Sequence, residues 1–201
     1  MQTNIRTGSE SASAANQLYT VAGVSALLYV IVSLATITFT DWNNPTATST
    51  TLMVLNVLGF VALLPVVLGV YQHLRPASSA LSGIAVVSGV LALIGGATGA
   101  AAGYDTTLGI VGGLFASFGM LLFFGLSGYL ALTGRLLPAG WALLSIVLGI
   151  MAVTAGIISG VAGSNSAITG LAWTAFSLLT IAWAIWTAME FLRRGRAASA
   201  A

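Results

Sequence analysis

Few residues in this sequence can do chemistry. His73 is the only histidine, cysteine is absent, and the acidic residues are Glu10, Asp41, Asp105 and Glu190. A lone imidazole can ligate one face of a haem or a similar macrocycle, so His73 is the one candidate cofactor ligand. An ordinary zinc site needs several such ligands. We therefore expect no metal site and no cofactor, and the alternative role for His73 is that of a polar residue at a helix end.

The acidic residues do not suggest ion coupling or catalysis. Asp41 and Asp105 lie in polar breaks between apolar segments, whereas ion-coupling carboxylates lie within them. Glu190 precedes Arg193 and Arg194 by three and four residues, the spacing at which helical side chains meet. This spacing predicts an ion pair that anchors a helix end, and the alternative is a site for a charged ligand. No phosphate loop, nucleophile elbow or metal-binding helix motif occurs, so we expect no enzymatic activity.

Two apolar segments carry residues that could line a pocket. The last segment has an aromatic and hydroxyl stripe with a spacing of three or four residues, and the second segment has an amide and a proline. The candidates are Asn56, Pro65, Trp173, Phe176, Thr180 and Trp183. A proline within a helix removes one backbone hydrogen bond and can kink it. These residues could line a site for an apolar ligand, or they could simply pack between helices.

The elements that would position these residues are apolar throughout. Of the 201 residues 58% are hydrophobic and 5% charged, and the mean hydropathy is +1.02. Six segments of about 20 residues or more could each cross a hydrocarbon core of about 30 Å. They lie near residues 18–39, 51–71, 81–102, 108–132, 141–161 and 168–192. Backbone groups in lipid must be paired within the segment, so the predicted fold is an all-α, polytopic transmembrane six-helix bundle.

The remaining sequence predicts two short tails. Residues 1–16 are small and polar, which favours a disordered N-terminal tail. Residues 17–192 form the transmembrane domain, and residues 193–201 form a short basic tail. The third and fifth segments have small residues at every fourth position, which allows close helix approach. This pattern predicts that these two helices are central in the bundle.

The charges predict an orientation. With six spans, all the arginines fall on one side of the membrane, and Asp41 and Asp105 fall on the other. The arginines are Arg6, Arg75, Arg135, Arg193, Arg194 and Arg196. Arginine near the ends of spans marks the cytoplasmic side, so both termini should be cytoplasmic. A net charge of +2 spread between apolar segments does not form a phosphate-binding face, so we expect no nucleic-acid partner.

The sequence also resembles a known family. Residues 123–150, FFGLSGYLALTGRLLPAGWALLSIVLGI, and residues 71–76, YQHLRP, are similar to a family of uncharacterised six-helix bacterial membrane proteins, a domain of unknown function. The resemblance extends over residues 18–165. It implies a six-helix fold in a bacterial inner membrane and brings no catalytic residues.

These observations lead to two functional hypotheses. The first is a non-enzymatic integral membrane protein, either an accessory or scaffold subunit or a small binding protein. Its partners would be the lipid bilayer and other membrane subunits or further copies of itself. The alternative is a carrier or channel for a small neutral or apolar solute.

Overall fold

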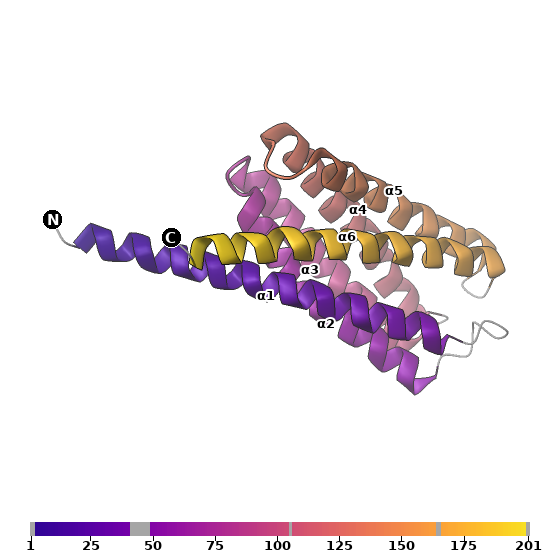
Figure 1. The fold of residues 1–201 in the computed structure, drawn as a ribbon. Helices are drawn as coiled ribbons and strands as arrows, with labels where there is room; N and C mark the ends of the chain where they lie inside the picture. The colour runs from indigo at the N-terminus through magenta and orange to yellow at the C-terminus, as the bar shows by residue number, and fades with distance from the viewer. Residues whose placement is uncertain (1–2, 41–48, 105, 164–165, 200–201) are drawn as a thin grey trace.

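The computed structural model describes residues 3–40, 49–104, 106–163 and 166–199. Over these ranges the chain folds into six α-helices and no strands (Figure 1), which confirms the predicted all-α class. The helices are α1 (Thr3–Phe39), α2 (Thr50–Leu74), α3 (Ser79–Ala102), α4 (Thr107–Gly134), α5 (Ala139–Ala162) and α6 (Ala167–Ser199). Asp41 and Asp105 lie outside the described residues.

Each helix has a stretch long and apolar enough to cross a membrane. Within the described ranges these stretches are Asn16–Phe39, Thr50–Leu74, Ser79–Ala102, Thr107–Gly134, Ala139–Ala162 and Ala167–Arg196. They agree with the six predicted segments to within four residues at every end. The hydrophobic length of each segment was therefore sufficient to locate the helices.

Hydroxyl side chains fix where three helices begin. Ser49, Ser78 and Thr106 precede α2, α3 and α4, and each accepts a hydrogen bond from the backbone N–H three residues later, at 3.2, 3.3 and 3.0 Å. These bonds pair N–H groups that have no carbonyl partner within the helix. Such a cap stabilises a helix by about 1 kcal/mol.

The first and last helices extend beyond their apolar stretches. Helix α1 begins at Thr3, so a helical backbone covers most of residues 1–16, where the sequence predicted a disordered tail. Helix α6 continues to Ser199, through most of the predicted basic tail at residues 193–201. Extending a formed helix costs far less than nucleating one, which explains why small polar residues continue the two helices. Figure 1 shows the start of α1 projecting beyond the bundle.

The helices form a closed ring. Each helix packs against its neighbours in the sequence, and α6 returns to pack against α1 (Figure 1). The prediction that the third and fifth helices are central is wrong, because α3 packs mainly on α2 and α4, and α5 mainly on α4 and α6. The small residues instead bring single pairs of helices together. A Cβ atom added to Gly112 would lie 2.6 Å from the carbonyl oxygen of Gly95, across the interface between α3 and α4.

Large apolar side chains occupy both the interior and the outer surface. Phe123, Phe124, Trp183 and their neighbours belong to one continuous buried cluster. The outward faces are apolar as well, and they include Ile31, Val87, Phe118 and Leu171, each more than half exposed. So many large apolar side chains on the outside are unusual for a protein surrounded by water.

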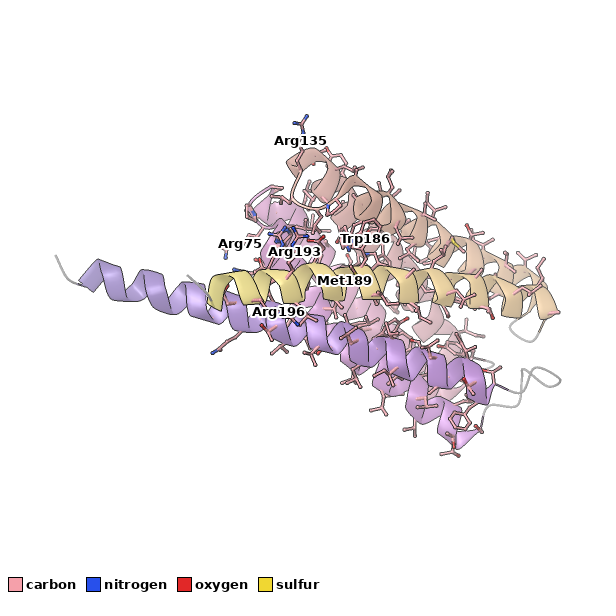
Figure 2. The ribbon with its side chains drawn as sticks, viewed as in Figure 1. Arg75, Arg135, Trp186, Met189, Arg193 and Arg196 are labelled. Atoms are coloured by element: carbon pink, nitrogen blue, oxygen red, sulfur yellow. The ribbon has the colours of Figure 1, made fainter. Side chains whose placement is uncertain are left out.

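Described arginine side chains gather at one end of the bundle, which we call the arginine end (Figure 2). They are Arg75 and Arg135, just after the last turns of α2 and α4, and Arg193, Arg194 and Arg196 in the last two turns of α6. Helix α1, which contains Arg6, begins at this same end (Figure 1). The arginine side chains that the structure describes therefore share one end of the bundle, and the side of a membrane on which they lie stays a prediction.

Candidate functional site

Three helices and one loop meet around His73 at the arginine end. The group comprises Tyr19 of α1, His73 of α2, Phe191 and Arg194 of α6, and Leu136 in the loop between α4 and α5, and we call it the His73 cluster. His73 itself is 8% exposed. It is the most buried titratable side chain at this end for which hydrogen bonds to other elements are seen, so the cluster is the candidate functional site.

The loop after α4 supplies the acceptor at the centre of this cluster. Arg135 adopts a left-handed backbone conformation (φ 52°, ψ 34°) and ends α4, and the N–H groups of Arg135 and Leu136 both donate to the carbonyl of Ala131. The carbonyl oxygen of Leu136 then accepts from Nε2 of His73 at 3.0 Å and from Nη2 of Arg194 at 3.2 Å. One carbonyl therefore links α2 and α6 to the loop.

These contacts fix the tautomer of the imidazole. Because Nε2 faces a carbonyl oxygen, it must carry the proton. The other nitrogen, Nδ1, is then the acceptor, and the hydroxyl of Tyr19 donates to it at 3.4 Å. Both ring nitrogens are engaged, so His73 in this conformation has none left for a macrocycle or a metal. The described residues also contain no group of three or more side chains of the kinds that bind metals.

Aromatic rings within the His73 cluster also pack against one another. The ring centroids of Tyr19 and Phe191 are 5.4 Å apart, and those of Tyr19 and His73 are 5.9 Å apart in an edge-to-face arrangement. The His73 and Phe191 rings are 6.3 Å apart. Such contacts add about 0.5 to 1.5 kcal/mol per pair beyond the area they bury. The cluster therefore fastens α1, α2 and α6 together.

The predicted ion pair at the end of α6 is not found. In the part of the chain that the structure describes, Glu190 makes no ion pair with Arg193 or Arg194. Arg194 turns to the carbonyl of Leu136 instead, while Arg193 is exposed. Glu190 is half-buried and interacts electrostatically with His73. The acceptor for the Arg194 side chain is therefore a loop carbonyl and not the carboxylate of Glu190.

The predicted stripe on α6, which comprises Trp173, Phe176, Thr180 and Trp183, lies in the packed interior. Trp183 is buried, and its indole N–H donates to Oγ of Ser145 at 2.9 Å. In return, the indole of Trp141 on α5 donates to Oγ1 of Thr187 on α6 at 2.9 Å. The two rings are 5.6 Å apart. We call these four residues the tryptophan clasp, because each helix supplies one indole donor and one hydroxyl acceptor.

The remaining stripe residues extend this packing along α6. The indole of Trp173 donates to Oγ of Ser159 on α5 at 2.9 Å, and its ring meets Phe176 edge-on at 5.6 Å. Thr180 is buried and donates to the carbonyl of Phe176 within its own helix. All four predicted stripe residues are thus brought together, but as a packing face between helices.

The predicted residues of α2 lie apart from that face. Helix α2 continues through Pro65, which is half-buried. Asn56 is also half-buried and follows the buried Leu52 by one turn, on the side of α2 that turns inward. Among the described residues, Asn56 has no hydrogen-bond partner. The structure therefore does not join Asn56 and Thr180 into one hydrogen-bonded path.

Sequence reasoning missed Trp141, Ser145 and Thr187 of the clasp and Tyr19 of the His73 cluster. A signal for the clasp was present, because Ser145 follows Trp141 by four residues and Thr187 follows Trp183 by four. Two facing helices with the same spacing of indole and hydroxyl can pair reciprocally. No comparable signal in the sequence points to the carbonyl of Leu136.

Comparison with known proteins adds no relative. No family model, curated protein or solved structure matches this chain. The resemblance to the uncharacterised bacterial family therefore stays a prediction. What the fold and the site define is a class of protein: an all-helical ring whose six described helices are each long and apolar enough to span a membrane.

Proposed function

We propose that this protein is a multi-pass integral membrane protein whose termini and arginine end face the cytoplasm. Three features support this: the length and hydropathy of the six helices, their apolar outward faces, and the arginines at one end. Arginine next to a span is retained on the cytoplasmic side. The family resemblance suggests a bacterial inner membrane.

Cysteine labelling in intact cells tests this topology, because the native chain has no cysteine. Ala80, in the first turn of α3, is exposed at the arginine end, and Thr107, in the first turn of α4, is exposed at the opposite end. We expect an impermeant maleimide to label Thr107→Cys in intact cells, but Ala80→Cys only after permeabilisation. Labelling of both positions from the same side would refute the topology.

The proposed role is that of a non-enzymatic accessory or scaffold subunit. The observation that carries it is the use of interior polar groups to join helices, as in the tryptophan clasp and the His73 cluster. In lipid, helix association depends on packing and on such interhelical hydrogen bonds. A bundle held in this way is rigid and leaves its outward faces for lipid, other membrane subunits or further copies of itself.

Purification from native membranes in mild detergent tests the role. We expect a second membrane protein, or further copies of this chain, to copurify in a fixed ratio. The variant Phe118→Ala removes an exposed aromatic side chain from α4 and should leave the fold intact. If the partner binds to α4, this variant should change the ratio in which the two proteins copurify. A strictly monomeric protein with no constant companion would contradict the scaffold role.

A carrier or channel for a small neutral or apolar solute is the alternative. It is favoured by Asn56, an amide on the inward side of α2 with no partner among the described residues. Tyr29 and Thr180, which interact with each other, supply further polar groups within the ring. Solute flux into liposomes that is lost in Asn56→Leu but kept in Thr174→Val would establish the carrier and exclude a purely structural role.

A further inference from the structure

One face of α6 carries two exposed arginines at the end of an apolar strip. Its members follow one another at intervals of three or four residues, so they lie along one side of the helix. They are Leu178, Ala182, Ile185, Met189, Arg193 and Arg196, all exposed, and we call them the α6 strip. The apolar part, from Leu178 to Met189, covers 12 residues, and these two end residues are about 16 Å apart along the helix axis at a rise of 1.5 Å per residue. That length is close to half of a hydrocarbon core of about 30 Å.

A tryptophan with an unused donor lies beside this strip. The six-membered ring of Trp186 rests on the first turn of α5, where a Cβ added to Gly140 would lie 2.6 Å from Cη2. The indoles of Trp141, Trp173 and Trp183 all donate to hydroxyl groups. The indole N–H of Trp186, by contrast, has no acceptor among the described residues. Figure 2 shows Trp186, Met189, Arg193 and Arg196 in succession along α6.

The charge at the end of the strip is not neutralised within the described part of the chain. Glu190 is the one acidic side chain that the structure describes, and it interacts with His73. Arg193 and Arg196 are exposed and make no ion pair or hydrogen bond there through their side chains. Guanidinium groups bind phosphate in a bidentate manner. The α6 strip therefore presents phosphate donors at one end and an apolar track that leads away from them, with the indole donor of Trp186 beside the track.

We propose that the α6 strip is a binding site for one anionic phospholipid, such as phosphatidylglycerol. The phosphate lies at Arg193 and Arg196, and the N–H of Trp186 donates to an oxygen of the headgroup or ester region. One acyl chain runs along Met189, Ile185 and Leu178. This inference rests on the proposed location in a membrane. Each arginine near an anionic lipid strengthens its binding about fivefold.

Quenching of Trp186 by brominated lipids tests the site in the full-length protein. The protein is reconstituted in phosphatidylcholine vesicles that contain increasing fractions of brominated phosphatidylglycerol or brominated phosphatidylcholine. The Trp186 signal is the difference between the wild type and Trp186→Phe. Because two arginines contribute, we expect half-maximal quenching at a mole fraction of phosphatidylglycerol roughly 25-fold lower than that of phosphatidylcholine. The double variant Arg193→Gln/Arg196→Gln should bring the two values together.

The matched control is Arg75→Gln/Arg135→Gln, which removes the same charge at the same end but away from the strip. It should keep the preference for phosphatidylglycerol. Equal quenching by both lipids in the wild type, or an equal loss of preference in the control, would overturn the lipid site while leaving the membrane location standing. No quenching by either brominated lipid would instead overturn the membrane location and the lipid site with it.

Discussion

Replacing Thr187 with valine is the sharpest test of the tryptophan clasp. Threonine and valine have nearly the same shape and both branch at Cβ, so the substitution removes one hydroxyl and little else. That hydroxyl accepts from the indole of Trp141 at 2.9 Å and donates to the carbonyl of Trp183 at 2.8 Å. Trp141 is fully buried. In Thr187→Val its N–H therefore loses its acceptor in a place that water does not reach.

The expected cost follows from these contacts. A buried donor left without a partner costs about 1 to 3 kcal/mol, whereas hydrogen bonds between membrane helices average about 0.6 kcal/mol and reach about 1.7. Full burial of Trp141 places this bond toward the upper end of the second range. The carbonyl of Trp183 loses the hydrogen bond from the Thr187 hydroxyl but keeps its backbone hydrogen bond within α6. The loss of the hydroxyl bond to this carbonyl therefore adds little to the cost. We expect Thr187→Val to lower the free energy of unfolding by about 1.5 kcal/mol.

Unfolding in mixed micelles of dodecyl maltoside and SDS, followed by circular dichroism, measures this change. Thr174→Val is the matched control on the same helix, because the Thr174 hydroxyl donates to the carbonyl of Gly170 at 2.8 Å and receives no indole. Its cost should stay below about 0.5 kcal/mol. Faster hydrogen exchange of one indole N–H in Thr187→Val should identify Trp141. If the two variants lose equal stability, the reasoning about the clasp is refuted.

The same unfolding assay checks three further expectations. His73→Phe keeps the ring packing but removes both imidazole hydrogen bonds, so it should lower the free energy of unfolding by about 1 to 2 kcal/mol. An unchanged free energy of unfolding would show that the hydrogen bonds of the His73 cluster do not stabilise the fold. Gly112→Ala should cost about 1 to 3 kcal/mol, because the new Cβ would lie 2.6 Å from the oxygen of Gly95. Gly125→Ala, where an added Cβ meets nothing within 4 Å, is its control and should be harmless. Ser127→Ala should be neutral or stabilising, because the buried Ser127 hydroxyl has no partner in the described part of the chain; a clear loss of stability would reveal a hidden partner.

The six helices could be predicted from the sequence because one physical constraint determines them. An apolar segment of about 20 residues in lipid must pair its backbone groups internally, and a helix does so. Hydroxyl residues such as Ser49, Ser78 and Thr106 add the points at which helices begin. The extension of α1 toward Thr3 was not predicted. The polar composition of residues 1–16 shows that they bury little apolar surface, but it does not show that continuing an already formed helix costs little free energy.

The arrangement of the helices could not be predicted in the same way. In a soluble helix the apolar side marks the core, but here both the interior and the surroundings are apolar. Phe118 and Phe123 lie on the same helix, yet Phe118 is 58% exposed and Phe123 is 4% exposed. Hydrophobic periodicity therefore does not show which side of α4 faces inward. Pairing of α1 with α6 also depends on contacts between residues far apart in the sequence.

Small polar residues indicate the interior of this bundle better than large apolar ones do. Ser145, Thr180 and Thr187 are buried, while many leucine, isoleucine and valine side chains face outward. A serine or threonine in a helix can donate to the carbonyl four residues earlier, as Ser145 and Thr187 do, and its oxygen can still accept from an indole. A hydroxyl four residues after a tryptophan on two facing helices thus satisfies both partners without water. Trp186 has no such acceptor among the described residues, and the phospholipid that we propose on the α6 strip would provide one.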